Sequence, residues 1–194
     1  MKEKFINNCI SFVKNNDIEI QEDKLRYGLE GIYLTFGKFL VIFPLAILLG
    51  IFKEFILTLI FFNIIRYPAF GIHANKSSTC LLSSTLILLG IPLLMTKITI
   101  TLQVKIILCI FTFICFILYA PADTVKRPLT NKKKRILRKI ATCIIAIIYS
   151  IFIIIFNNND ISIYLLSGMI IETILILPIT YRIYGMPYKN YAMV

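Results

Sequence analysis

Residues 140–156 read IATCIIAIIYSIFIIIF, a run of apolar side chains without a single charge. Such a run is typical of a helix that crosses a lipid bilayer, for which about 20 residues are needed. Apolar character also dominates five other segments: Gly31–Phe52, Phe55–Ile65, Leu81–Met95, Ile106–Ala120 and Ile161–Tyr181. We therefore predict an all-α, polytopic membrane protein with about six transmembrane helices.

The composition supports this class of protein. Of the 194 residues, 58% are hydrophobic and 16% are charged, whereas a soluble domain is about half apolar and about a quarter charged. The excess of apolar side chains must face lipid. We expect one integral membrane domain over residues 1–194, with an interfacial N-terminal segment (1–30), a transmembrane region (31–181) and a tail (182–194).

The first 16 residues interleave charged and apolar side chains, so no cleavable signal peptide is expected. Their apolar residues recur at helical spacing, which predicts an amphipathic helix on the membrane surface. These residues are Phe5, Ile6, Cys9, Ile10 and Val13.

The distribution of Lys and Arg predicts the orientation. With six spans, 18 of the 21 basic residues lie on one side of the membrane, and only Lys53, Lys97 and Lys105 lie on the other. The richer side is cytoplasmic by the positive-inside rule. We therefore expect a plasma membrane protein whose two termini and basic loop (121–139) are cytoplasmic. The net charge of +11 is then explained by membrane orientation, and nucleic acid is not an expected partner.

The segment Phe55–Ile65 is too short to span the bilayer. As a helix it would rise only about 16 Å, roughly half of the hydrocarbon core. Either the helix continues through Arg66 and Pro68, or the chain bends within the membrane. Non-helical backbone at that depth is tolerated only inside protein or beside water, so this region is the first indication of a functional site.

Residues 66–80 read RYPAFGIHANKSSTC and contain the only histidine of the chain, His73. The Ser/Thr-rich stretch 77–79 suits a helix N-cap, which would place Cys80 in the first turn of the next helix. The partial positive charge there favours a nucleophilic thiolate. On one continuous helix His73 and Cys80 would be ~10.5 Å apart, but a bend between them would bring them together. Gly71 and Pro68 are nearby residues that permit bends. The alternative is an interfacial histidine and a cysteine that packs between helices.

Three stretches together resemble a known family. Residues 66–80 contain an Arg, a Gly-containing turn, a His-Ala pair and a Cys seven residues after the His; the matching residues are Arg66, Gly71, His73, Ala74 and Cys80. Residues 119–129 are Ala-Pro-rich and precede the basic loop, and residues 27–30 precede the first apolar segment. In this order they resemble the AgrB membrane endopeptidases of peptide quorum sensing, over nearly the whole chain. A departure is Phe70, where many members have a second Gly.

The resemblance implies a cysteine endopeptidase that needs no cofactor and cleaves the C-terminal part of an AgrD-type propeptide at the cytoplasmic side. Cys80 would attack the scissile carbonyl to form a thioester, with His73 as general base. A Cys or Ser of the propeptide would then close a thiolactone or lactone ring, yielding an autoinducing peptide. Arg66, Gly71 and Ala74 would support the site. The propeptide, the lipid bilayer and a second copy of the chain are the expected partners.

The basic loop has two interpretations. Its cations are a topology signal that contacts anionic lipid, and in addition they are candidates for binding the acidic tail of the propeptide. The candidate residues are Lys126, Arg127, Lys132, Lys133, Lys134 and Arg135. A metal site is not expected, because one histidine and scattered cysteines do not form a zinc-ligand pattern.

Three other polar residues have open roles. Arg66 would orient a substrate carboxylate, stabilise its motif or anchor a lipid headgroup. Asp123 is a candidate third member of the site beside His73. Glu172 lies within an apolar segment, where an acid usually faces inward, either paired with a residue such as Lys38 or serving a function. The alternative function is a small peptide transporter, in which Glu172 and Lys38 would line the path.

Overall fold

The computed structural model describes residues 2–14, 22–72, 77–124 and 128–192. The secondary structure of these residues is helical, with one isolated bridge between Phe70 and Ala122 and no named strand. The prediction of an all-α fold is therefore confirmed. The chain divides into two compact units, residues 1–47 and residues 48–194.

The first unit contains α1 (Lys2–Lys14) and nearly all of α2 (Glu22–Leu48). The guanidinium of Arg26 on α2 donates to the Glu3 carboxylate at 3.0 Å and to the Asn7 side-chain oxygen at 2.7 Å. The rings of Phe5 and Tyr33 lie 5.8 Å apart. The predicted N-terminal helix therefore exists, and it contacts α2; its place on a membrane surface stays a prediction.

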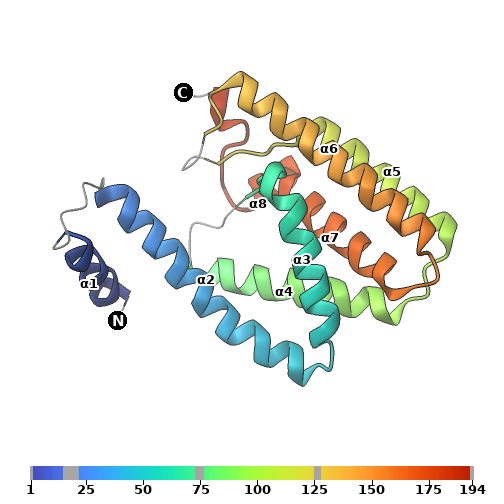
Figure 1. Cartoon of the computed structure of the whole chain (residues 1–194), viewed down its shortest axis with the longest axis horizontal. Helices are drawn as coiled ribbons and strands as arrows, with labels where there is room; N and C mark the ends of the chain where they lie inside the picture. Colours follow the sequence, from blue (N-terminus) through green and yellow to red (C-terminus); the bar gives the residue numbers. More distant parts are fainter. Residues whose placement is uncertain (1, 15–21, 73–76, 125–127, 193–194) are drawn as a thin grey trace. The chain divides into compact units, whose positions relative to one another are not determined.

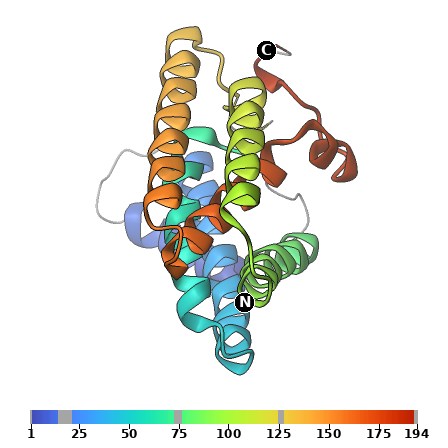
Figure 2. The same cartoon turned by 90° about the vertical axis from the view of Figure 1, so that its right-hand side faces the viewer.

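The second unit is a helical bundle (Figure 1). Its helices include α3 (Phe52–Ala69), α4 (Ser77–Lys97), α5 (Leu102–Tyr119), α6 (Lys132–Ile155), α7 (Asp160–Ile176) and α8 (Pro178–Ile183). Helices α5 and α6 run side by side. In the view of Figure 2 both are upright, and α4 is seen nearly end-on. Helix α7 packs against α3, α4, α5 and α6, so it forms the centre of the bundle.

The central position of α7 depends on small residues. A Cβ atom added to Gly168 would lie 3.0 Å from the Phe62 backbone nitrogen and 3.3 Å from the Phe61 carbonyl carbon. The missing side chain therefore lets α7 approach the α3 backbone closely. The surrounding core includes Ile65, Phe116, Ala146, Ile153, Leu166 and Met169.

Four helical segments in the described residues are long and apolar enough to span a bilayer: Gly28–Leu48, Ser78–Lys97, Leu102–Tyr119 and Lys132–Ile155. This number differs from the six predicted. Helix α3 carries Lys53, Glu54 and Arg66 within its 18 residues, and α7 has 17 residues, many of them buried in the bundle. The two remaining apolar segments are thus helical, but their length and charge do not mark them as spans.

Helix boundaries also differ from the expected segments. Helix α3 continues through Arg66 and Pro68 to Ala69, which is the first of the two alternatives for that region. The last apolar segment is divided between α7 and α8 at Leu177, which has extended backbone (φ −63°, ψ 137°). Pro178 causes the division, because proline lacks an N–H and disfavours helical backbone at the residue before it.

The predicted basic loop 121–139 is shorter than expected. Helix α6 already begins at Lys132, and the side chain of Asn131 caps it by accepting from the Lys134 N–H at 3.2 Å. The predicted end of the loop is wrong because Lys and Arg are good helix formers, so the basic residues from Lys132 onward begin α6.

Candidate functional site

The turn that follows α3 has unusual backbone conformations. Phe70 adopts φ 64° and ψ −133°, and Gly71 adopts φ 119°. Glycine reaches such angles without a steric cost, whereas for a residue with a Cβ atom they are strained. The departure from the family pattern at Phe70 therefore falls on a position whose backbone favours glycine.

Backbone hydrogen bonds hold this turn to two distant segments. The Gly71 N–H donates to the Ala122 carbonyl at 2.9 Å, and the Ala122 N–H donates to the Ala69 carbonyl at 2.9 Å. The Ile72 N–H donates to the Leu175 carbonyl at 3.1 Å. Residues 69–72 are thus joined to the segment after α5 and to the last turn of α7.

A buried ion pair lies under the turn. Arg66 donates to the Glu172 carboxylate Oε2 at 3.2 Å, and Glu172 is fully buried. The same guanidinium donates to the carbonyls of Phe70 at 3.2 Å and Ile72 at 2.9 Å. Within the second unit the partner of Glu172 is therefore Arg66, whereas the sequence suggested a residue such as Lys38. These contacts tie Arg66 to the backbone of its own motif.

The second carboxylate oxygen of Glu172 is not part of the ion pair. Its Oε1 is buried and has no hydrogen-bond partner among the residues that the structure describes. A Cβ atom on Gly71 would lie 3.3 Å from this oxygen and 2.7 Å from the Arg66 Nη1 atom. Only glycine therefore fits between the ion pair and the Leu175 carbonyl.

Cys80 is the fourth residue of α4 and belongs to its first turn, as predicted. Helix α4 begins at Ser77, so residues 77–79 share this turn instead of preceding it. Cys80 is half-buried, and its carbonyl accepts a hydrogen bond from the Ser83 hydroxyl at 3.3 Å. Cys109 and Cys115, by contrast, are buried in α5. The thiol proposed from sequence thus lies eight residues beyond the anchored turn.

Several predicted site residues lie outside the described part of the chain. They are His73, Ala74, Lys126 and Arg127. The juxtaposition of His73 with Cys80 accordingly stays a prediction.

Asp123 is buried and its carboxylate is engaged by backbone. Oδ1 accepts from the Asn190 N–H at 3.0 Å, and Oδ2 accepts from the Leu129 N–H at 3.1 Å. The Tyr181 hydroxyl donates to the carbonyls of Ala122 and Asp123, both at 3.0 Å. Asp123 therefore joins the loop before α6 to the C-terminal segment. Its proposed role beside His73 stays a prediction.

The basic residues of α6 fall into two groups. Lys132, Lys133 and Lys134 are exposed on the first turn, whereas Arg135, Arg138 and Lys139 are half-buried. Arg138 donates to the Tyr67 carbonyl at 2.9 Å and lies over the Phe70 ring at 4.3 Å. The basic start of α6 is thus at the same end of the unit as the anchored turn.

Sequence reasoning missed the three-segment anchor, which consists of backbone bonds to Ala122 and Leu175. Such bonds leave no signature in side-chain types. The Arg66–Glu172 pair had a signal, since an isolated acid in an apolar helix requires an opposite charge, and Arg66 lies within the most polar motif.

Comparison with known proteins gives a family match over a range that includes the candidate site. Residues 6–176 match the family model described as Accessory gene regulator B. A Staphylococcus epidermidis protein named Accessory gene regulator protein B is 32% identical over 169 residues, which cover 86% of this chain and 84% of that protein. A Staphylococcus aureus protein of the same name is 32% identical over 168 residues, covering 86% and 88%. No solved structure matches the chain.

Proposed function

Because the chain belongs to the Accessory gene regulator B family, we propose that it is a membrane cysteine endopeptidase of peptide quorum sensing. Its substrate is an AgrD-type propeptide, which it cleaves on the C-terminal side of the future signal peptide. The observation that carries the proposal is the position of Cys80, a half-buried thiol on the first turn of α4. The partial positive charge of a helix N-terminus stabilises negative charge that develops on such a group.

The reaction consists of two acyl transfers. The Cys80 sulfur forms a bond to the scissile carbonyl carbon, and the C–N bond breaks. His73 takes the thiol proton and returns it to the departing amine. A Cys or Ser of the propeptide then attacks the thioester, displaces the Cys80 sulfur and closes a thiolactone or lactone ring. The acyl bond energy is retained in the first step, so no cofactor is required.

The anchored turn has a positioning role in this proposal. Residues 69–72 directly precede His73 in the chain and are bonded to two other segments. A catalytic base must be held within hydrogen-bond reach of its proton donor, and a fixed backbone on one side of His73 reduces the entropy that this costs. Arg66 and Gly71 support the turn, through the ion pair and the close approach described above.

The orientation of the site follows from charge. The turn lies at the end of the unit that also carries the start of α6, where Lys132, Lys133 and Lys134 are exposed. Positively charged ends of membrane helices face the cytoplasm, so we place the site, both termini and propeptide capture at the cytoplasmic side. The three exposed lysines are suited to bind an acidic propeptide tail.

Coexpression with the propeptide tests the function. Cys80→Ala is expected to abolish cleavage, as read from the mass of the propeptide. Cys143→Ala removes another half-buried cysteine, one on α6 outside the proposed site, and is expected to retain cleavage. Equal membrane levels of the two variants exclude misfolding as the cause. Cleavage that persists in Cys80→Ala would end the protease proposal.

His73→Ala provides the second test. It is expected to abolish cleavage, and the double variant with Cys80→Ala should be no worse than either single variant. Residues that act as one catalytic unit show this non-additivity. Cleavage by His73→Ala at the rate of the unaltered chain would remove the general base from the mechanism.

A further inference from the structure

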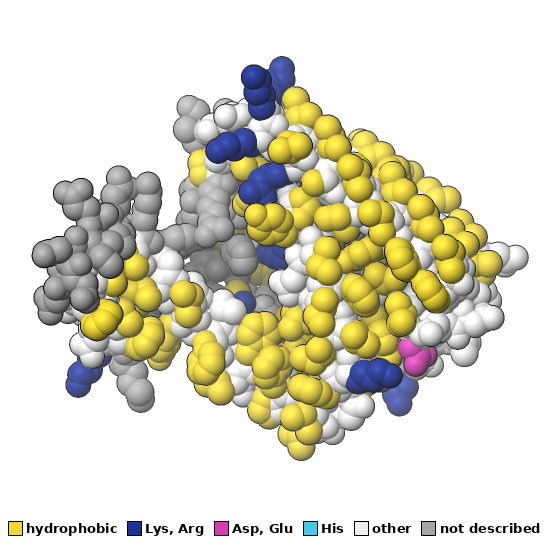
Figure 3. Space-filling view, viewed as in Figure 1, with side chains coloured by type: hydrophobic (Ala, Val, Ile, Leu, Met, Phe, Trp, Pro, Cys, Tyr) yellow, Lys and Arg dark blue, Asp and Glu magenta, His cyan; other side chains and the backbone are white. Residues whose placement is uncertain are grey.

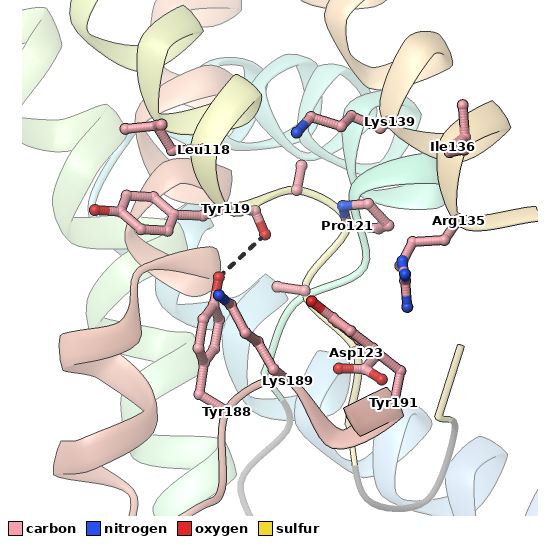
Figure 4. A pocket seen from close by; sticks show the side chains of 12 residues that line it. Leu118, Tyr119, Pro121, Asp123, Arg135, Ile136, Lys139, Tyr188, Lys189 and Tyr191 are labelled. Carbon is pink, nitrogen blue, oxygen red and sulfur yellow. Dashed lines mark hydrogen bonds between the residues drawn. The ribbon is translucent and has the colours of Figure 1, made fainter. Parts of the chain in front are cut away.

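A cavity of about 240 Å³ lies where α5 ends and α6 begins. Its lining comes from three parts of the second unit: the end of α5 with the segment after it, the beginning of α6, and the C-terminal segment (Figure 4). The C-terminal segment contributes Tyr188, Lys189 and Tyr191, and α6 contributes Arg135, Ile136 and Lys139. The acyl-transfer steps proposed above use none of these six residues, although the sequence also makes Arg135 a candidate for binding the propeptide tail.

The cavity has an excess of positive charge. Arg135, Lys139 and Lys189 line it, and no ion pair involves any of them among the residues placed by the structure. Asp123 is the acid in the lining, but each of its carboxylate oxygens already accepts a backbone N–H. Arg135 also lies at the end of the first turn of α6, where the helix dipole disfavours positive charge. A negatively charged ligand would relieve both effects.

The guanidinium of Arg135 is held in a definite place. It lies over the Tyr191 ring with 3.8 Å between Cζ and the ring centroid. In Figure 4 the Arg135 side chain extends from α6 toward Tyr191 and Asp123, while Tyr188 and Lys189 approach from the C-terminal segment. A stacked guanidinium loses less freedom when it binds an anion, and its planar donors match phosphate oxygens.

The surroundings of the cavity are those of a membrane interface. Helices α5 and α6 are both long and apolar enough to span a bilayer, and the cavity lies at their shared end. Leu118 and Ile136 at its edge are 60% and 49% exposed. Figure 3 shows basic side chains gathered at the end where α6 begins, with hydrophobic side chains covering much of the helix surface beyond. A phosphate group bound in this cavity would thus be adjacent to an apolar surface suited to acyl chains.

From this geometry we propose that the cavity binds the phosphate headgroup of an anionic phospholipid. Arg135 donates to the phosphate oxygens, Lys139 and Lys189 supply further charge, and the acyl chains lie along the exposed apolar side chains that begin with Leu118 and Ile136. Basic pockets between membrane helices on the cytoplasmic side commonly bind such headgroups. The ligand would join the C-terminal segment to α5 and α6.

The full-length chain, purified in mild detergent from vesicles of phosphatidylcholine with a minor share of phosphatidylglycerol, tests the proposal. Lipid that stays bound is identified by mass spectrometry. Phosphatidylglycerol should be retained in preference to phosphatidylcholine and in a saturable amount. Arg135→Gln and Lys139→Gln should each weaken retention about 10-fold, the effect of losing one charged hydrogen bond.

A matched control separates the cavity from diffuse charge. The double variant Lys132→Gln/Lys133→Gln removes two cations from the same helix, but neither residue lines the cavity. It should retain phosphatidylglycerol like the unaltered chain, and equal loss in both sets of variants would overturn the proposal. Lys189→Gln, which lies outside α6, should also weaken retention; if it does not, the three-sided site is wrong.

Competition identifies the source of the anion. Inorganic phosphate should displace the lipid poorly, because it lacks acyl chains that contact Leu118 and Ile136. Ready displacement by inorganic phosphate, or by a soluble acidic peptide, would show that the cavity is a general anion or peptide site and would overturn the lipid assignment. Since retention is measured without propeptide, its outcome is independent of the protease function.

Discussion

Replacement of Gly71 by alanine is the sharpest perturbation of the anchored turn. The new Cβ atom would lie 2.7 Å from the Arg66 Nη1 atom, 3.3 Å from the Glu172 Oε1 atom and 3.3 Å from the Leu175 carbonyl oxygen. The φ of 119° is in addition strained for any residue with a side chain, at a cost of about 1–3 kcal/mol. Overpacking adds about 1–3 kcal/mol.

The expected loss of stability is therefore about 2–6 kcal/mol. For a chain of this size, this corresponds to a fall in Tm on the order of 10 °C. The assay is thermal unfolding of the purified protein in detergent, followed by circular dichroism, with propeptide cleavage measured below the lower Tm. Cleavage should also fall, because the Arg66–Glu172 pair must shift to admit the methyl group.

Gly90→Ala is the matched control. Gly90 lies inside α4 and nothing is within 4 Å of an added Cβ atom. Alanine is favoured over glycine in a helix by about 0.5–1 kcal/mol, so this variant should be as stable as the unaltered chain or slightly more so. If Gly71→Ala and Gly90→Ala unfold at the same temperature, the account of the turn is refuted.

Three further changes test other parts of the structure. Phe70→Gly should be more stable than Phe70→Ala by about 1–3 kcal/mol in thermal unfolding, because both lose the ring but only glycine relieves the positive φ; the reverse order would contradict the backbone conformation. Lys105→Met should lower the unfolding free energy by about 1–3 kcal/mol. The reason is that the Lys105 ammonium donates to the Asn157 carbonyl and the Ser162 hydroxyl, each at 2.7 Å. Lys97→Met, at an exposed lysine, is the control. Burial raises the pKa of Tyr188 to about 12, so the folded chain keeps a proton that the unfolded chain loses, and stability should fall as pH rises above about 10. Ultraviolet titration of Tyr188→Phe against the unaltered chain should assign a late-titrating phenol to this residue, and a missing difference would exclude its burial.

The sequence was informative where the physical signal is local. Apolar runs marked the positions of the helices, and the Ser/Thr-rich stretch placed Cys80 in the first turn of α4. The boundaries were less accurate because Lys and Arg occur equally well in loops and in helix ends. The basic residues from Lys132 onward therefore looked like loop, although they begin α6.

The contacts between residues distant in the chain could not be predicted from the sequence. The sequence placed a costly acid at Glu172 and a basic residue at Arg66, but the two lie 106 positions apart along the chain and several cations were available. The two segments that anchor Gly71 contribute only main-chain groups, at Ala122 and Leu175. Every residue has those groups, so no residue type marks the anchor.

The hydrogen bond from the Ile72 N–H to the Leu175 carbonyl has a consequence for biogenesis. The ribosome synthesises the turn long before it synthesises Leu175, and α7 must be made before this bond can form. During synthesis Arg66 also lacks its ion-pair partner until Glu172 has been made. The turn therefore cannot form all of its contacts until α7 has been synthesised, and a nascent chain that ends before Glu172 lacks both the Ile72–Leu175 bond and the Arg66–Glu172 pair.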